Sequence, residues 1–315
     1  MPSSPRANVL LAAGSLALAL GGAEVVVRAT LRARFETPTD ERSLAYRYDA
    51  ELGWFPRENE ARTFVGSRPV QVRHNRDGFR DREHGKKEHP RIAFLGDSFV
   101  WGYDAEAAER FGDRWQERRP AWEALNLGVS GYGTDQEYLL ARRFLPGLEP
   151  DIVVLFYSLN DSRDNRTNFR YGAYYKPYFE KDGGRLLVKG VPVPRSLAYR
   201  FASHPVLFRS YLARGVAALF LQPKQEELRL PDVTRDLLLA VRALVESLGA
   251  RFAVAFVQRE PGFQAFCAES GIPFLDLTDA EQYPEIGHWT PKGHLAVAEK
   301  LDRFLDERAW LSISR

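Results

Sequence analysis

Five short apolar runs constrain the fold of this chain more than any other feature of its sequence. They are rich in Val, Ile, Leu and Phe and lack the regular apolar–polar alternation of a half-exposed strand. Strands of a parallel sheet that is covered on both faces have this composition. We therefore predict that the runs are buried parallel strands. They are Ile92–Leu95, Ala124–Leu127, Ile152–Tyr157, Phe252–Val257 and Phe274–Leu277.

Helical patterns separate these runs. From Pro231 to Leu248, apolar residues recur at spacings of three and four, and the pattern stops at Gly249, which is typical of an amphipathic helix and its end. Thr290 and Pro291 supply the cap and the first turn of a last helix. Strands that alternate with helices predict an α/β fold with a doubly wound sheet.

The first part of the chain contains a long apolar run, Val9–Val27, in which Glu24 is the only charged residue. A helix of about 20 apolar residues is long enough to cross a bilayer. Two interpretations stay open, namely an uncleaved signal anchor and a signal peptide that is cut after the small residues Gly21 and Ala23. The apolar residues continue past that cut, which favours the anchor.

Composition divides the chain into three parts. Residues 1–35 form the signal anchor or signal peptide, residues 36–90 are polar with scattered aromatics and are expected to pack on the core, and residues 91–315 form the α/β domain. The alternation of strands and helices breaks at about 162–230, where we predict an insertion that lies over the strand ends. Within it, Asp182–Gly184 predicts the turn of a hairpin.

Charge and cysteine content exclude several classes of function. The formal net charge is +2, from 44 basic and 42 acidic residues. The basic residues form no concentrated block, so nucleic acid is not an expected partner. Cys267 is the only cysteine, which excludes an internal disulfide and a cysteine-rich metal site. We expect neither a metal nor a cofactor.

Four polar segments follow predicted strands. Residues 96–98, 126–133 and 158–161 come directly after the first three strands, and residues 285–294 follow the last strand and lead into the final helix. Ligands of an open parallel sheet bind outside the carboxyl ends of its strands. These segments are therefore expected to meet at one edge of the sheet, which we call the rim.

The side chains in these segments are those that nucleophilic catalysis needs. Ser98 can act as a nucleophile if a neighbouring base takes its proton, and His288 can be that base near neutral pH. Glu285, three residues earlier, can orient the imidazole and stabilise its charged form. The amides of Ser98 and Gly131 and the side chain of Asn160 are candidate donors to the oxyanion.

The four segments resemble sequence blocks of the SGNH (GDSL-type) hydrolases. "GDS" is similar to the first block, "NLGVSGYG" to the second, "SLND" to the third and "EIGHWTPKGH" to the fifth. The resemblance implies a three-layer α/β/α sandwich with a flavodoxin-like five-stranded parallel sheet. It also implies ester hydrolysis, often of acyl groups on carbohydrates, without a metal. It marks Ser98 as nucleophile, Gly131 and Asn160 as oxyanion donors and His288 as base.

Two positions depart from these blocks. Ser158 stands where the third block has glycine, and Glu285 stands where the fifth block has aspartate. A glutamate can serve as the acid of a related triad. Glu285 is also compatible with pointing away, which would leave a Ser98–His288 dyad. Asp279 is another carboxylate before His288, but its spacing does not match the block.

The segments "LGWFPREN" and "NRDGFRD" resemble the lead-in of membrane-anchored bacterial members of the family. We therefore predict a serine esterase at the bacterial inner membrane, anchored by its N-terminal helix with the catalytic domain extracytoplasmic, or secreted if the N-terminus is cleaved. Its expected partners are the membrane and a small-molecule or glycan ester. An O-acyltransferase that uses the same site and a catalytically silent glycan-binding or envelope-assembly protein are the alternatives. The sequence does not indicate an oligomeric state.

Overall fold

A five-stranded parallel sheet forms the centre of the molecule. We describe a computed structural model, which covers residues 5–35, 45–171, 174–204, 206–221, 228–285 and 287–312. The strand order is β13-β12-β7-β5-β6, and every neighbouring pair is parallel. This is the flavodoxin-like order, so the predicted fold is confirmed. The strands are β5 (Arg91–Leu95), β6 (Glu123–Asn126), β7 (Ile152–Tyr157), β12 (Arg251–Phe256) and β13 (Phe274–Asp276), each within one residue of its predicted bounds.

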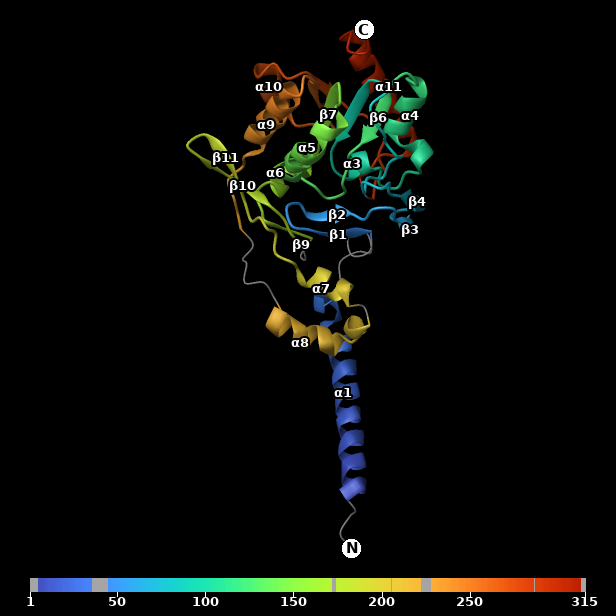
Figure 1. Ribbon diagram of the computed structural model, residues 1–315, viewed down its shortest axis with the longest axis vertical. Helices are drawn as coiled ribbons and strands as arrows, with labels where there is room; N and C mark the ends of the chain where they lie inside the picture. The colour runs from blue at the N-terminus through green and yellow to red at the C-terminus, as the bar shows by residue number, and fades with distance from the viewer. Residues whose placement is uncertain are drawn as a thin grey trace.

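Helices cover both faces of this sheet, as Figure 1 shows. One apolar cluster joins the sheet to α5 (Thr134–Leu148), α9 (Thr234–Ser247) and α10 (Pro261–Glu269). A second joins the opposite face to α4 (Phe111–Arg118) and α11 (Pro291–Glu307). The molecule therefore has the three layers of an α/β/α sandwich.

Alternate residues of each strand enter these two clusters. In β5, Ala93 and Leu95 face the α5–α9 side, whereas Ile92 and Phe94 face the α4–α11 side. Successive side chains of a strand point to opposite faces, so a strand that is covered on both faces needs apolar residues throughout. Full burial of one Leu, Ile or Phe side chain contributes about 1.5–3 kcal/mol.

The helix ends follow from local capping. Thr290 caps α11, because its hydroxyl accepts a hydrogen bond from the Gly293 amide at 3.1 Å, and Pro291 is the first helical residue, as predicted. Helix α9 begins at Thr234, three residues after the predicted start at Pro231. The reason is that the Asp232 carboxylate accepts the Thr234 amide at 3.0 Å, which satisfies an N–H at the start of the helix.

The lead-in segment forms two hairpins. They pair β1 (Tyr46–Asp49) with β2 (Gly53–Pro56) and β3 (Ala61–Val65) with β4 (Pro69–Arg73). They are held to the sheet domain by hydrogen bonds as well as by apolar contacts. The side chain of Gln136 in α5 donates to the Leu52 carbonyl at 2.7 Å, and the Tyr132 hydroxyl donates to the Trp54 carbonyl at 2.5 Å.

Between β7 and β12 the chain leaves the sheet and forms small elements. The hairpin of β10 and β11 pairs Asp182 with Arg185 around the predicted glycine turn. Lys176, which is fully buried, forms an ion pair with the equally buried Asp135 at the start of α5. The elements are α6 (Leu159–Asp164), β8 (Phe169–Arg170), β9 (Tyr174–Tyr175), β10 (Tyr178–Asp182), β11 (Arg185–Lys189), α7 (Leu197–Ser203), η2 (Leu207–Arg209) and α8 (Tyr211–Leu221).

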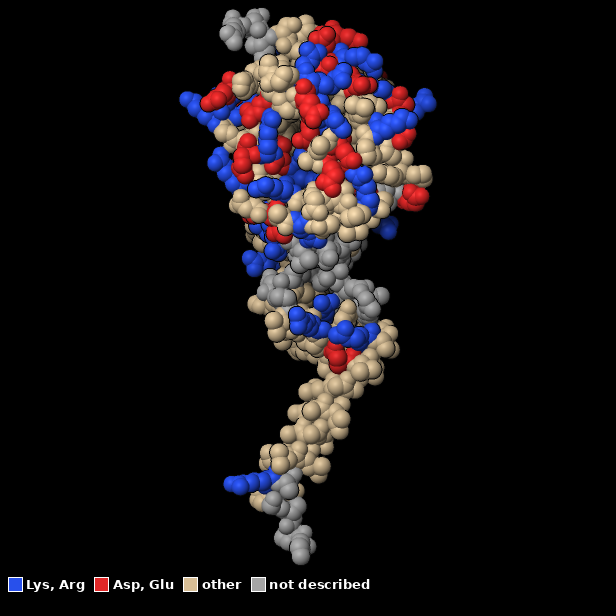
Figure 2. Space-filling view, turned by 90° about the vertical axis from the view of Figure 1, so that its right-hand side faces the viewer, with Lys and Arg blue, Asp and Glu red and all other residues tan. Residues whose placement is uncertain are grey.

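The N-terminal helix α1 (Pro5–Phe35) projects away from the sheet domain, with α8 lying across it (Figure 1). Its segment Asn8–Leu31 is long and apolar enough to cross a membrane, and none of the most apolar part is buried inside the protein. In the space-filling view this part of the helix is almost free of charge (Figure 2).

Candidate active site

The candidate nucleophile Ser98 stands at the end of the buried strand β5. It is the first residue of the short helix α3 (Ser98–Trp101), and the Asp97 carboxylate accepts the Phe99 amide at 3.0 Å at the start of that helix. A Cβ at Gly96 would lie 2.4 Å from the Val100 side chain, so the turn has no room for a side chain at this position. The turn leaves Ser98 half-buried at the rim.

His288 meets Ser98 across the rim. The two residues are 190 positions apart, and the distance from His288 Nε2 to Ser98 Oγ is 2.7 Å. His288 lies in the loop that enters α11, two residues before the cap Thr290. A hydroxyl in hydrogen-bond contact with an imidazole nitrogen is the arrangement by which a base activates a serine.

Two aromatic rings hold the imidazole of His288. The ring of Tyr103 stacks on it with a centroid separation of 4.3 Å and an interplanar angle of 14°, and the Phe99 ring lies 5.0 Å away at 40°. Both rings belong to the segment that follows Ser98. The same piece of chain therefore places the nucleophile and fixes the plane of its partner.

Gly131 lies in the buried segment between β6 and α5. Its φ is +84°, a conformation that residues with a side chain rarely adopt. The segment is fixed from the lead-in, because the Trp54 indole N–H donates to the Ser130 carbonyl at 3.3 Å. The role of the Gly131 amide as an oxyanion donor stays a prediction.

Asn160 is held by carboxylates. Its side-chain nitrogen lies 3.1 Å from Asp164 Oδ2, 3.4 Å from Asp97 Oδ2 and 3.5 Å from Asp161 Oδ1. An amide nitrogen carries two hydrogens, so the shorter contact uses one of them. The second is free for a substrate oxygen only if the longer contacts to Asp97 and Asp161 give way. Asn160 thus lies next to the nucleophile turn, and its predicted role as a donor requires this exchange of partners.

Several buried carboxyl groups lie beneath this part of the rim. Burial raises the pKa of Asp97 to about 6, against the lowering effect of its hydrogen bonds from Phe99 and Asn160. Burial and the nearby carboxylates raise the pKa of both Asp161 and Glu137 well above the usual range. The folded state therefore binds the protons of these acids more tightly than the unfolded chain does.

The two candidate acids differ in their surroundings. Asp279 has a side chain that is 70% exposed and forms an ion pair with Lys300 of α11. Glu285 is also exposed and lies on the same loop as His288. Because Asp279 has a different partner, Glu285 is the better candidate to orient His288, and that role stays a prediction.

An open cleft of about 750 Å³ adjoins α6. Leu159, the neighbour of Asn160, forms part of its wall, and Glu260 closes it from the side of β12. We call it the α6 cleft. Its lining residues are Leu159, Ser162, Arg163, Arg166, Thr167, Phe169, Arg170, Tyr171, Leu228, Arg229, Leu230 and Glu260.

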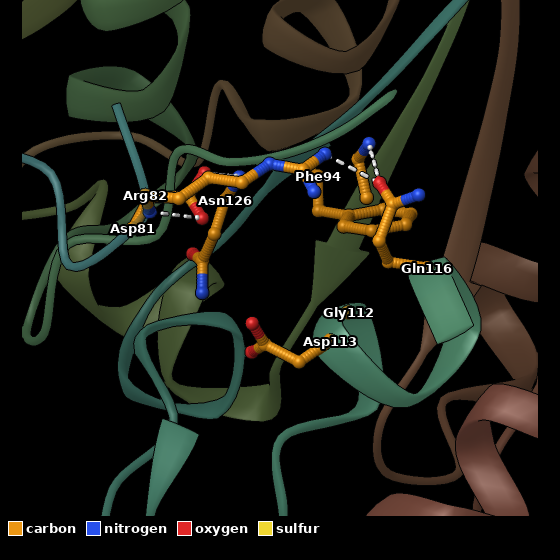
Figure 3. Close-up of a pocket in the computed structure, with 8 residues that line it drawn as sticks. Asp81, Arg82, Phe94, Gly112, Asp113, Gln116 and Asn126 are labelled. Atoms are coloured by element: carbon orange, nitrogen blue, oxygen red, sulfur yellow. Dashed lines mark hydrogen bonds between the residues drawn. The ribbon is translucent and has the colours of Figure 1, made fainter. Parts of the chain in front are cut away.

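A second cavity, shown in Figure 3, lies at the β6 edge of the sheet. Its volume is about 10 Å³, which is too small for an ester substrate. In it the Asp81 carboxylate accepts the Asn126 amide at 2.7 Å, and Arg82 donates to the Gln116 side chain. Hydrogen bonds around this cavity therefore hold the lead-in segment to the sheet domain. Among the described residues, no group of three His, Cys, Asp or Glu side chains is arranged to hold a metal ion.

Sequence reasoning missed the residue that fixes the far end of α3. Arg80 is buried and donates to the carbonyls of Gly102 at 2.6 Å and Ala105 at 2.7 Å, and its guanidinium lies 4.7 Å from the centre of the Trp101 ring. Carbonyls at the end of a helix need such donors. No local pattern marks Arg80, since its partners Gly102 and Ala105 lie more than twenty positions away in the chain.

A comparison with models of protein families identifies the family of this chain. A model of the GDSL-like lipase/acylhydrolase family matches residues 94–296, and no curated protein matches the chain. A lipolytic protein of the G-D-S-L family from Desulfitobacterium hafniense is 12% identical, with a TM-score of 0.43, over 69% of this chain and 100% of that chain. The psychrotrophic esterase EstA from Pseudoalteromonas sp. is 12% identical, with a TM-score of 0.40, over 71% and 99%. The acetyl xylan esterase AlAXEase is 13% identical, with a TM-score of 0.39, over 68% and 98%.

Proposed function

We propose, from the premise that this chain belongs to the GDSL-like lipase/acylhydrolase family, that Ser98 is the nucleophile and His288 the general base of its ester hydrolysis. One observation carries the assignment, namely the 2.7 Å hydrogen bond between His288 Nε2 and Ser98 Oγ. The serine follows the first strand of the sheet, where ligands of such folds bind.

In the acylation step, His288 Nε2 takes the hydroxyl proton as Ser98 Oγ attacks the ester carbonyl carbon. The carbonyl oxygen becomes an oxyanion, to which the amides of Ser98 and Gly131 and the side chain of Asn160 donate. Loss of one such donor costs about 2.7–4 kcal/mol of transition-state stabilisation. The imidazolium returns the proton to the leaving alcohol oxygen. Water then attacks the acyl group with the same base, and Ser98 recovers its proton.

Glu285 completes the site in this proposal by orienting His288 and stabilising its protonated form. Its position three residues before the histidine supports the role. Its exposure means that water screens the interaction, so the carboxylate contributes less here than a buried triad acid would.

We further propose that the ester is an O-acyl group on a carbohydrate. Phe169 and Tyr171 line the α6 cleft beside the residue that precedes Asn160. Aromatic rings present an apolar face together with polar edges, which suits the apolar faces and hydroxyl edges of a sugar ring. The volume of the cleft, about 750 Å³, has room for a saccharide.

The N-terminal helix is assigned as a signal anchor with the catalytic domain outside the cytoplasm. Helix α1 runs unbroken through the small residues Gly21 and Ala23 and continues to Phe35. Its exposed apolar surface has the length that a bilayer requires. Protease protection of intact cells and of inverted vesicles tests this assignment, and a full-length protein free in the cytosol contradicts it.

The test of the catalytic assignment uses the full chain in detergent with 4-nitrophenyl acetate and a serine-directed phosphonate. Wild-type protein is expected to hydrolyse the ester and to carry the label on Ser98, and Ser98→Ala is expected to do neither. Ser247→Ala, at the end of α9, is the control and should retain wild-type activity. A label on another serine refutes the assignment.

A further inference from the structure

The α6 cleft is rich in arginine. Arg163, Arg166, Arg170 and Arg229 line it, and Glu260 is the only acidic residue among its lining residues. Two of these arginines form ion pairs with aspartates that do not line the cleft. Arg166 pairs with Asp232 at 3.0 Å and Arg170 with Asp164 at 2.5 Å.

Arg229 differs from these pairs. Within the described part of the chain it has no ion pair. The cleft therefore offers at least one guanidinium that no described carboxylate neutralises, and a guanidinium binds carboxylate and phosphate groups through two parallel hydrogen bonds.

The cleft adjoins the neighbours of two of the three proposed oxyanion donors, Asn160 and Gly131. On one side, the Asp164 carboxylate joins Arg170 of the cleft to the side chain of Asn160, at 2.5 and 3.1 Å. On the other side, the Tyr171 ring lies 6.4 Å from the Trp54 ring, and Trp54 donates to the carbonyl that precedes Gly131. The cleft thus adjoins residues that hold two of the oxyanion donors, and the alcohol part of the substrate is assigned to it on that ground.

We propose that the α6 cleft binds an anionic group on the alcohol part of the ester, so that the substrate is an acylated acidic glycan. The inference rests on the proposed ester hydrolysis of a carbohydrate. Phe169 and Tyr171 pack on the sugar ring, and Arg166 and Arg229 bind the oxygens of its carboxylate or phosphate. Arg170 stays with Asp164, where it positions Asn160.

The test compares three substrates that differ in the group at C6, namely an O-acetylated methyl glucoside, which is neutral, and the corresponding glucuronoside and 6-phosphate, which are anionic. Acetate release is expected to show a KM at least tenfold lower for an anionic substrate than for the neutral one, with a similar kcat. Arg166→Gln and Arg229→Gln should remove this preference by raising the KM for the anionic substrates to the value for the neutral one. Arg185→Gln, on the exposed β10–β11 hairpin, is the matched control.

A binding measurement separates this inference from the proposed function. The Ser98→Ala protein should bind the deacetylated glucuronoside or 6-phosphate more tightly than the glucoside in calorimetry, and this preference does not depend on hydrolysis. Equal affinity for all three sugars overturns the anionic cleft, even if the esterase is active. Absence of hydrolysis of 4-nitrophenyl acetate overturns the proposed function and leaves the calorimetric result to decide the cleft.

A second inference comes from the contact between α1 and α8. Glu24, the one charged residue in the apolar run, accepts hydrogen bonds from the start of α8. The donors are the Ser210 hydroxyl at 2.8 Å and the amides of Tyr211 at 3.0 Å and Leu212 at 2.8 Å. Arg28, one turn along α1, binds Glu24 at 2.9 Å and the Arg209 carbonyl at 3.0 Å. A carboxylate from one helix thus caps another.

Helix α8 exposes apolar residues beside this junction. Leu219 and Phe220 are each 81% exposed, and Val216 lies on the same side at helical spacing. Figure 1 shows α8 crossing α1 at a large angle between the sheet domain and the free part of α1. Basic side chains gather at this level in Figure 2, above the uncharged length of α1.

We infer that α8 lies in the membrane interface, with its exposed apolar side in the lipid. Lipid is the partner of this side, because α8 continues the apolar surface of α1. A helix parallel to the membrane plane buries such an apolar side at the headgroup boundary. Arg28, Arg209 and Arg214 lie at the level where anionic headgroups attract cations. Glu24 fixes the depth of α8 along α1.

The test uses the full chain in vesicles of phosphatidylcholine and phosphatidylglycerol, with Cys267→Ala as background. A nitroxide on Phe220→Cys is expected to be more accessible to oxygen than to a water-soluble nickel complex. A label on Leu187→Cys, on the exposed hairpin, should show the reverse, and a label on Leu18→Cys in α1 should lie deepest. Adding Glu24→Ala is expected to shift the label at position 220 toward water.

If the label at position 220 behaves like the one at position 187 while the label at position 18 is in lipid, the position of α8 is refuted and the anchor stands. If the label at position 18 is also in water, both the anchor and the interfacial helix are refuted.

Discussion

The rim of the sheet and the base of the molecule, where α1 meets α8, are organised in opposite ways. At the rim, the candidate residues lie in the segments that follow the strands or lead into the last helix, as Ser98 lies three residues after β5 and His288 two residues before Thr290. At the base, Glu24 binds residues 186 to 188 positions away. The difference teaches that topology brings the rim together, whereas specific polar contacts bring the base together.

Two sides of the rim also differ in whether their buried carboxyl groups have a cation as partner. Asp97, Asp161 and Glu137 lie under the site with their pKa values raised by burial. On the side of the predicted insertion, burial also raises the pKa of Asp135, but the ion pair with Lys176 works against this shift. Ionising the acids under the site costs desolvation free energy that no cation in the ranges which the structure covers offsets. For Asp135, the attraction to Lys176 offsets part of that cost.

Substitution of Ser98 should have the largest effect on activity, since the rim should keep its fold and lose ester hydrolysis. Ser98→Ala is expected to lower kcat/KM for an ester by about 10³-fold or more, because the nucleophile acts as a unit with His288. Thermal unfolding should stay within about 2 °C of wild type, since Ser98 is half-buried and its loss leaves no large cavity. A marked fall in melting temperature would show that the residue is structural.

The acid of the site gives the next largest effect. If Glu285 orients His288, Glu285→Gln should lower kcat by about 10- to 100-fold, less than the loss seen for a buried triad acid, with KM nearly unchanged. Glu285→Asp, which restores the family pattern, should retain substantial activity, and His288→Ala should be nearly inactive. Wild-type turnover in Glu285→Gln would leave a Ser98–His288 dyad.

How much could be predicted from the sequence follows from this contrast. The five strands, the glycine hairpin and the cap of the last helix are encoded by neighbouring residues, so pattern was enough to find them. The Ser98–His288 contact follows from the rule that strand ends share one edge. Arg80 and the capping of α8 by Glu24 could not be predicted, because each depends on a partner that only the folded chain brings near.

Lys176 tests whether paired charge holds the segment after β7 on the sheet domain. Lys176→Met leaves Asp135 buried without its cation, so the free energy of unfolding should fall by about 3–5 kcal/mol. The double variant Lys176→Met with Asp135→Asn should recover most of this loss. Denaturant unfolding measures both. Equal losses in the single and double variants would assign the effect to packing rather than to charge.

Glu137 gives the smallest effect and sharpens the comparison at the site itself. Burial and neighbouring carboxylates raise its pKa well above the usual range. A raised carboxyl pKa means that the folded state binds the proton more tightly than the unfolded state, so stability is greatest at low pH and falls as pH rises above the ordinary glutamate pKa.

Glu137→Gln imitates the protonated form and cannot ionise. The difference in the free energy of unfolding between Glu137→Gln and wild type should therefore be near zero at pH 4. By pH 8 the variant should be more stable by about 1 kcal/mol, because Asp97 and Asp161 bear the rest of the cost of ionisation. Thermal unfolding at a series of pH values measures the difference, with the exposed Glu246→Gln as the matched control. A difference that does not change with pH would mean that the Glu137 carboxyl does not titrate in this range, and the cost of unpaired acids would then lie with Asp97 and Asp161.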